Sequence, residues 1–215
     1  MTTEVKGRPP GAAPGQARTR FARAAVVEGA RALFVERGYA ATTIDAISER
    51  SDVPSATVYR LFTSKLGILS ALLEVSIVGD DDPVALQDRP DAKALFAEAD
   101  PRKQLAGFAA IARQINVRAA PVYRVLVGAA ASELEAAELL AEYTRRRQTG
   151  QGQIARLLAR AGALREEVKE RDAADVIHAL MSPEVFRLLV SDRGWSPDRY
   201  ERWLAHTLAD QLMAR

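Results

Sequence analysis

The stretch VPSATVYRLFTSK, residues 53–65, gathers hydrogen-bond donors at helical spacing. On a helix over residues 55–62, Val58 and Phe62 lie four residues apart and share a buried face. The other side presents the hydroxyl, phenol and guanidinium groups of Ser55, Thr57, Tyr59 and Arg60. Phosphate oxygens accept hydrogen bonds from all of these groups, and a guanidinium also binds the edge of guanine. The pattern predicts a nucleic-acid-binding surface; the alternative is an amphipathic helix with a solvated face.

The elements around this stretch form a helix-turn-helix pattern. Gly38 follows the first apolar repeat as a helix stop, and Thr43 has the residue type of an N-cap. Pro54 suits the entry to the third helix, and Ser64 can cap the fourth. Two short helices separated by only a few residues are typical of a helix-turn-helix. The predicted helices cover residues 18–37, 44–50, 55–62 and 64–78.

Composition divides the chain into three parts. Residues 1–17 are rich in Gly, Pro and Ala and are predicted to form a flexible arm, which either touches a polyanion or has no role. Residues 18–65 form the predicted DNA-binding domain, with the fourth helix as a connection, and residues 66–215 form a second domain. The first 65 residues contain ten Lys/Arg and six Asp/Glu, whereas the rest contain twenty and twenty-two. This sign change suggests a basic module before a slightly acidic one.

Composition also excludes several classes of protein. The 215 residues, of which 48% are apolar, permit one large or two small domains with a real core. No run of about 20 uncharged apolar residues occurs, so no membrane partner is expected. The N-terminus lacks the apolar segment of a secretory signal, and the absence of cysteine fits a reducing cytoplasm. Neither a metal nor another cofactor is expected.

Residues 18–78 resemble the DNA-binding domain of the TetR/AcrR transcriptional regulators. One matching motif consists of Phe34, Gly38, Tyr39, Thr42 and Thr43. A second consists of Thr57, Val58, Tyr59, Phe62 and Lys65. The resemblance implies an all-α fold of about nine helices, with a helical ligand-binding and dimerisation domain after the helix-turn-helix. It also implies a homodimer that binds a near-palindromic operator, usually as a repressor, and a ligand that shifts the two DNA-reading heads apart.

The resemblance also assigns roles by position. Thr43, Tyr59 and Lys65 would contact phosphates, whereas Ser55, Thr57 and Arg60 would face the groove. The expected DNA-binding set is Thr42, Thr43, Ser55, Ala56, Thr57, Tyr59, Arg60, Leu61 and Lys65.

Three positions depart from the family pattern. Asp52 and Ala56 stand where glycine is frequent, and Leu61 stands where histidine or tyrosine is common. Leucine cannot donate a hydrogen bond, so Leu61 either contacts a thymine methyl group or packs. The role of Leu61 and the operator sequence therefore stay open.

The rest of the chain also has a helical pattern without strand alternation. A short helix is expected over residues 91–99, Pro183 should kink or divide its helix, and Asp172 and Ser196 are plausible caps. The further predicted helices cover residues 101–117, 121–131, 133–161, 172–191 and 197–214.

These helices provide candidates for a ligand pocket and a dimer interface. Apolar residues at helical spacing more often form plain core, and that alternative stays open for both sets. A pocket with this lining would suit a small hydrophobic or amphipathic ligand. The pocket candidates are Phe108, Ile111, Arg113, Ile115, Tyr123, Leu126, Met181 and Phe186. The dimer candidates are Val176, Leu180, Leu188, Trp203, Leu204 and Leu208.

Two other features receive a plainer interpretation. The run YTRRRQ, residues 143–148, is predicted to be a solvated helix face rather than a second nucleic-acid site. His178 lies among apolar neighbours and is predicted to be structural. No metal spacing, phosphate-binding glycine loop or nucleophile motif occurs, so an enzyme is not expected. The open alternatives are a helical adaptor for proteins and a transcriptional activator of the same fold; steep salt dependence would favour DNA over a protein partner.

Overall fold

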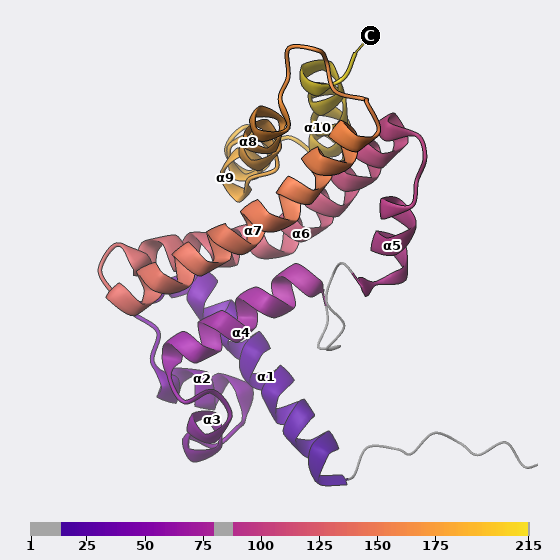
Figure 1. The fold of residues 1–215 in the computed structure, drawn as a ribbon. Coiled ribbons are helices and arrows are strands. Elements are labelled where there is room, and N and C mark those ends of the chain that lie inside the picture. The colour runs from indigo at the N-terminus through magenta and orange to yellow at the C-terminus, as the bar shows by residue number, and fades with distance from the viewer. Residues whose placement is uncertain (1–13, 80–87, 215) are drawn as a thin grey trace, which may run out of the picture.

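The protein is described from a computed structural model that covers residues 14–79 and 88–214 (Figure 1). These residues form ten α-helices, a π-helical segment at Arg187–Asp192 and no strand, which confirms the all-α class. The helices are α1 Pro14–Arg37, α2 Ile44–Ser51, α3 Ser55–Phe62, α4 Lys65–Val78, α5 Pro90–Phe96, α6 Pro101–Ala130, α7 Leu134–Arg160, α8 Glu170–Leu180, α9 Pro183–Phe186 and α10 Pro197–Leu212.

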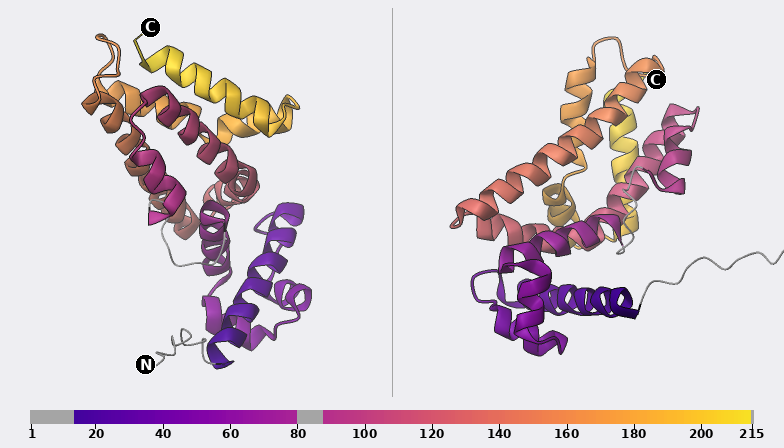
Figure 2. Two further views of the ribbon diagram at one scale, coloured as in Figure 1. Left: turned by 90° about the vertical axis from the view of Figure 1, so that its right-hand side faces the viewer. Right: turned by 60° about the horizontal axis from the view of Figure 1, so that its bottom comes forward.

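The helices form two packed groups with α4 between them. The short helices α2 and α3 lie beside α1 at one end of the molecule, and α8, α9 and α10 lie at the other (Figures 1 and 2). The long helices α6 and α7, of 30 and 27 residues, run side by side and connect the groups. Within the described ranges no single helix is long and apolar enough to span a membrane; α3 and α4 together have the composition but are bent by 66°.

Local capping explains where the helices of the first group begin and end. The Thr43 Oγ1 accepts a hydrogen bond from the Ala46 amide at 3.1 Å, as its residue type predicted. Asp52 ends α2 in the left-handed conformation, with φ 54°, which aspartate tolerates better than most residues. The Ser64 Oγ accepts from the Gly67 amide at 3.0 Å and begins α4. These caps fix the turn between the two short helices and the start of the connecting helix.

Gly67 allows the close corner between α3 and α4. A Cβ atom at this position would lie 2.1 Å from the main-chain oxygen of Phe62, far inside normal contact. Thr63, between the two helices, has a φ of 65°, which only a tightly constrained turn imposes on a threonine. The angle between α3 and α4 therefore depends on the absence of a side chain at residue 67.

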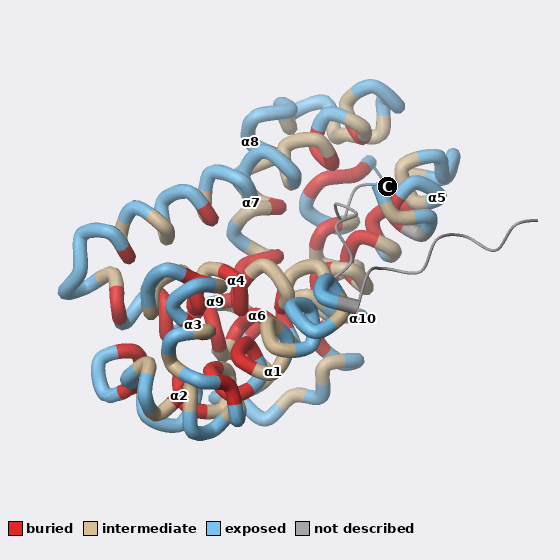
Figure 3. The backbone as a smooth tube through the Cα atoms, turned by 90° about the horizontal axis from the view of Figure 1, so that it is seen from below, coloured by how far each residue is buried: buried red, intermediate tan, exposed pale blue. Residues whose placement is uncertain are grey.

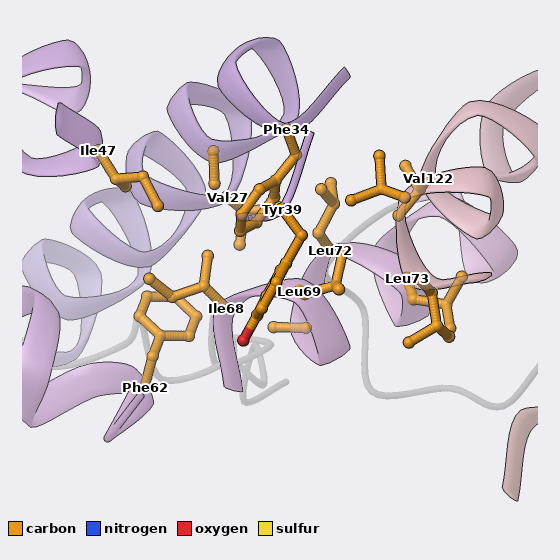
Figure 4. Close-up of a cluster of buried hydrophobic side chains, with 14 of the residues drawn as sticks. Val27, Phe34, Tyr39, Ile47, Phe62, Ile68, Leu69, Leu72, Leu73 and Val122 are labelled. Carbon is orange, nitrogen blue, oxygen red and sulfur yellow. The ribbon is translucent and has the colours of Figure 1, made fainter. Parts of the chain in front are cut away.

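A cluster of buried side chains, the lower core, joins the helix-turn-helix to α6 and α7. Buried residues gather where α1, α2, α4 and α6 meet (Figure 3). Ile68, Leu69 and Leu72 of α4 are fully buried, and they pack with Phe34 of α1 and Ile47 of α2 (Figure 4). The same cluster includes residues of α6 and α7, among them Val122. Since apolar burial stabilises by about 25 cal/mol per Å², these shared contacts hold α4 to both groups.

A second cluster of buried side chains, the upper core, lies between α6, α7, α8, α9 and α10. Tyr200, Leu204, Leu208 and Leu212 of α10 are fully buried in it. The Tyr200 ring also meets the Phe186 ring edge to face, with 4.9 Å between ring centroids.

Several predicted boundaries in the chain need correction. Residues 14–17 of the predicted arm belong to α1, while residues 1–13 lie outside the described part. The predicted break before Pro121 is wrong, because α6 continues through this proline. Proline costs one backbone hydrogen bond inside a helix, and packing of α6 against α4, α7 and α10 compensates.

Predictions for the last helices had mixed outcomes. The N-cap of α8 is Lys169, so the prediction that Asp172 caps this helix is wrong; its carboxylate lies in the first turn instead. Pro183 does divide the predicted helix, because α9 starts at this residue with the Ser182 side chain as its cap. Ser196 caps α10 as expected, accepting from the Arg199 amide at 3.2 Å.

Candidate DNA-binding surface and ligand cavity

Helix α3 has the two faces that its sequence predicts. Val58 and Phe62 are buried in the lower core, whereas Tyr59 is 53% exposed. Arg60 is also exposed and makes no hydrogen bond or ion pair within residues 14–79 and 88–214. Ala56 is exposed at the first turn and adds no bulk there. A phenol and a guanidinium are thus available to a partner on one face of α3.

The hydroxyl residues of α3 are less exposed than Tyr59. Ser55 is half-buried, and its hydroxyl donates to Asp45 Oδ1 of α2 at 2.9 Å. Its oxygen can still accept a bond, but its proton is already engaged. Thr57 is half-buried and Leu61 packs in part against the lower core. Leu61 thus contributes to packing.

The two threonines before α2 lie in different environments. Thr42 is only 1% exposed, and its hydroxyl donates to the Gly38 carbonyl at 2.8 Å. Its side chain is therefore withdrawn from the surface, unlike the expectation that it contacts DNA. Thr43 is exposed, and its oxygen already accepts the Ala46 amide. The Thr43 hydroxyl proton remains available to an acceptor such as a phosphate oxygen.

Lys65 is held against the domain rather than extended into solvent. Its Nζ donates to the Tyr39 carbonyl at 2.8 Å and lies 4.1 Å from the centroid of the Tyr39 ring. The ammonium has three protons, so two remain for other acceptors. Sequence reasoning did not identify Arg23 of α1, whose guanidinium lies 4.6 Å from the Phe62 ring centroid. Arg23 thereby adds positive charge beside the end of α3.

A cavity of about 320 Å³ lies among α4, α5, α6 and α7. Of the eight predicted pocket residues, Phe108, Ile111, Ile115 and Met181 line it. The other lining residues are Glu74, Ile77, Val78, Ala92, Phe96, Ala112, Asn116, Tyr143, Arg146, Arg147, Gly150, Gln151, Gln153 and Ile154.

The other four predicted pocket residues do not line this cavity. The Arg113 Nε is 2.9 Å from Glu201 Oε2, an ion pair that turns this guanidinium toward α10. Tyr123 is buried in the lower core and its hydroxyl donates to Glu184 Oε1 at 2.6 Å. Leu126 is fully buried in the lower core, and Phe186 packs in the upper one. Tyr123, Leu126 and Phe186 therefore serve packing, the alternative that their spacing had left open, whereas Arg113 forms an ion pair.

Helix α7 supplies polar groups that sequence reasoning missed. Tyr143, Arg147 and Gln151 follow one another at intervals of four residues and all line the cavity. The prediction that the run at residues 143–148 is only a solvated face is therefore wrong for Tyr143 and Arg147. The four-residue spacing was the available signal, but a long solvated helix shows the same spacing. Burial raises the pKa of the Tyr143 phenol, which stays neutral at physiological pH.

Helix α4 connects the cavity with the helix-turn-helix formed by α2 and α3. Glu74 and Ile77 line the cavity from the C-terminal half of α4. Arg118 of α6 donates to the carbonyls of Ser76 and Ile77 at 3.0 and 3.1 Å. Arg31 of α1 donates to the Ser76 hydroxyl at 2.7 Å. The end of α4 is thus bonded to both α1 and α6, beside the cavity.

The predicted dimer residues divide into two groups. Leu204 and Leu208 are fully buried within the subunit, so they cannot form an interface; the α10 face that carries them packs into the upper core. Leu188 is 50% exposed. Val176, Leu180 and Trp203 are half-buried, and the Trp203 ring meets the Trp195 ring edge to face at 6.0 Å.

Comparisons with known proteins agree with the helix-turn-helix. Residues 26–72 match the model of "Bacterial regulatory proteins, tetR family". The chain is 30% identical over 161 residues to the HTH-type transcriptional regulator TcmR of Streptomyces glaucescens, covering 74% of this chain and 68% of TcmR.

Solved structures share the fold. One is NalD, the secondary repressor of the MexAB-OprM multidrug efflux pump in Pseudomonas aeruginosa, with 22% identity, a TM-score of 0.66 and coverage of 89% of this chain and 96% of NalD. Another is a transcriptional regulator from Saccharomonospora viridis in complex with choline, with 20% identity, a TM-score of 0.67 and coverage of 90% and 98%. The relative TcmR, the matching family model and the helix-turn-helix together show that this chain belongs to the TetR family of DNA-binding transcriptional regulators.

Proposed function

We propose that this protein is a ligand-responsive repressor that acts as a cytoplasmic homodimer on a near-palindromic operator. The observation that carries the proposal is the path of α4, which begins at the corner with α3 and ends at the cavity. A helix of 14 residues extends about 21 Å. Because α4 is one continuous helix, a change at Glu74 or Ile77 can tilt it and reorient the DNA-binding group.

The proposed contacts to DNA lie on the exposed side of the helix-turn-helix. The Tyr59 phenol and the Thr43 hydroxyl would donate to phosphate oxygens. The Lys65 ammonium would donate to them through its two protons that have no partner among the residues that the structure describes. Arg60 has no partner in the described part of the chain and would bind a phosphate or a guanine edge in the major groove. Exposed Ala56 allows the start of α3 to approach the base pairs closely.

The proposed dimer surface involves the half-buried residues at the second end of the molecule. Leu188 is the most exposed of the apolar candidates, and Trp203 offers a large ring with part of its surface uncovered. Aromatic residues are enriched in the cores of interfaces, and a two-fold interface uses the same patch on both subunits. Two copies joined here would present two α3 helices to two half-sites, as a palindromic operator requires.

Repression is proposed over activation because NalD, which shares the fold, is named as a repressor. Transcription of the neighbouring genes should rise when the gene for this protein is deleted. A fall in that transcription would favour an activator instead. The adaptor alternative would leave both transcription and DNA binding unaffected.

The direct test is footprinting and gel-shift titration on the DNA that flanks the gene for this protein. We expect Tyr59→Ala and Arg60→Gln to lower operator affinity by about 10-fold or more each, since a good contact contributes about 1–3 kcal/mol. Arg145→Gln is the matched control, because Arg145 is an exposed arginine of α7 that pairs with Glu142. Operator affinity should also fall steeply as salt rises. Wild-type affinity for the Tyr59 and Arg60 variants would refute the assignment of this face.

A further inference from the structure

The cavity has two chemically different walls. Helix α6 contributes apolar side chains, among them Phe108, Ile111 and Ile115, which recur at helical spacing. Helix α7 contributes Tyr143 and Arg147, which are a phenol and a guanidinium one helical turn apart. One wall can therefore pack against hydrocarbon, while the other offers hydrogen-bond donors.

The charges on the lining do not cancel. Glu74 and Arg146 form a two-pronged ion pair, in which Nη2 of Arg146 lies 3.1 Å from Oε2 of Glu74. Arg147 is the third charged lining residue, and it leaves the lining with a net charge of +1. Its Nη2 donates to the main-chain carbonyl of His178 at 3.1 Å, and a carbonyl does not neutralise the charge of the guanidinium. Its guanidinium makes no ion pair with a carboxylate in residues 14–79 and 88–214.

Arg147 is half-buried beside an apolar surface, which makes the unneutralised charge significant. A charge removed in part from water is stabilised by an opposite charge that arrives with it. The nearest aromatic ring, that of Tyr143, lies 6.0 Å from the guanidinium carbon and offers only a weak attraction. Glu184 affects this region at longer range, but it does not line the cavity and its Oε1 accepts the Tyr123 hydroxyl.

Two further polar groups lie on the same wall. The Tyr143 hydroxyl makes no hydrogen bond in the described part of the chain, so it can donate to a ligand. The Gln151 Oε1 is 2.7 Å from His178 Nδ1, which leaves the amide protons of Gln151 as donors. Donors thus outnumber acceptors on the α7 wall.

We propose that the effector is a compact amphipathic anion, whose head group binds Arg147 and whose apolar part packs against α6. This inference rests on the proposed function, because it names the class of ligand for the same cavity. The volume of about 320 Å³ lies at the small end of ligand sites, which favours a compact molecule. The choline of the Saccharomonospora viridis complex carries the opposite charge, so this chain should select differently.

The test compares three probes with one hydrocarbon chain and different charges: octanoate, octanamide and octylammonium. Isothermal titration of the full chain should show octanoate binding about 10-fold or more tightly than either of the others, with choline weaker still. Arg147→Gln should lower octanoate affinity by about 10- to 100-fold and leave octanamide nearly unchanged. Arg147→Lys should retain part of the preference, and the outward-facing control Arg145→Gln should retain all of it.

The comparison of probes on the wild-type chain does not depend on how well any variant folds. Octanamide or octylammonium binding as tightly as octanoate would overturn the proposal, as would no binding of any probe. Preference for octanoate in a folded Arg147→Gln chain would overturn it too. Gel shifts on the same preparation separate the two proposals. If the chain binds its operator but does not prefer octanoate, only the proposal of an anionic effector is refuted. If the chain does not bind its operator, the proposed function as a regulator is refuted.

Discussion

The corner between α3 and α4 provides the sharpest test of how this sequence aims its recognition helix. In Gly67→Ala, the new Cβ would start 2.1 Å from the Phe62 oxygen, and real Cβ contacts essentially never fall below 3.0 Å. The Cβ and the Phe62 oxygen must therefore move apart by roughly 1 Å. This oxygen belongs to the main chain, so the backbone itself must shift, which costs more than turning a flexible side chain. Overpacking of this kind costs about 1–3 kcal/mol, which corresponds to a fall in Tm of about 2–12 °C for a chain of this size.

The same substitution should also impair DNA binding. The simplest relief of the clash opens the 66° bend between α3 and α4, which turns Tyr59 and Arg60 away from their contacts. We expect operator affinity to fall at least about 10-fold even at temperatures where the chain is folded, since losing a single good contact is enough. Circular dichroism melts and fluorescence anisotropy with labelled operator DNA would measure the two effects.

Gly128→Ala is the matched control for this prediction. Gly128 lies within α6, and a Cβ there would meet nothing within 4 Å. Alanine should therefore stabilise the helix by about 0.5–1 kcal/mol through its better helix propensity, and leave DNA binding unchanged. If Gly67→Ala behaved like Gly128→Ala in both assays, our account of the corner would be refuted.

Two further predictions concern the proposed dimer surface and alkaline stability. Trp203→Glu should give folded monomers by light scattering, whereas Leu204→Ala should lower the free energy of unfolding by about 2–5 kcal/mol and leave the dimer intact; an unchanged mass for Trp203→Glu would place the interface elsewhere. Burial, together with the nearby charge of Glu133, raises the pKa of Tyr39 to about 12, above the value of about 10 in the unfolded chain. The stability held by the neutral phenol is complete below pH 10 and is lost as pH rises through 12. Urea titrations across this window should show Tyr39→Phe losing about 2–3 kcal/mol less than wild type, and equal losses would contradict the assigned cause.

The buried and exposed faces of α3 could be predicted from the sequence because their determinants are local. The spacing of Val58 and Phe62 decides which side of α3 is buried, and Tyr59 then follows on the exposed side. Caps such as Thr43 act within a few residues of their own position. The exception was Thr42, whose hydroxyl is engaged by the Gly38 carbonyl in a turn that residue type alone does not specify.

The helices after α4 were harder to predict, because helical spacing does not say which neighbour a face meets. Phe108 and Leu126 lie on the same helix, yet one lines the cavity and the other fills the lower core. Leu204 was expected at an interface and is instead covered by its own subunit. The periodicity of α6 and α10 identified their apolar faces. Which helix each face packs against was decided only by the way α6 to α10 come together.

The sequence by itself determined the short helices α2 and α3, the family motif and the outward face of α3, since these depend on side chains one turn apart. Only the tertiary structure showed that Arg147, in an apparently ordinary charged run, borders an apolar cavity, and that Glu74 of α4 reaches the same place. These residues lie 73 positions apart in the chain. Their proximity arises from the packing of α4 and α7 around α6, which no local spacing encodes.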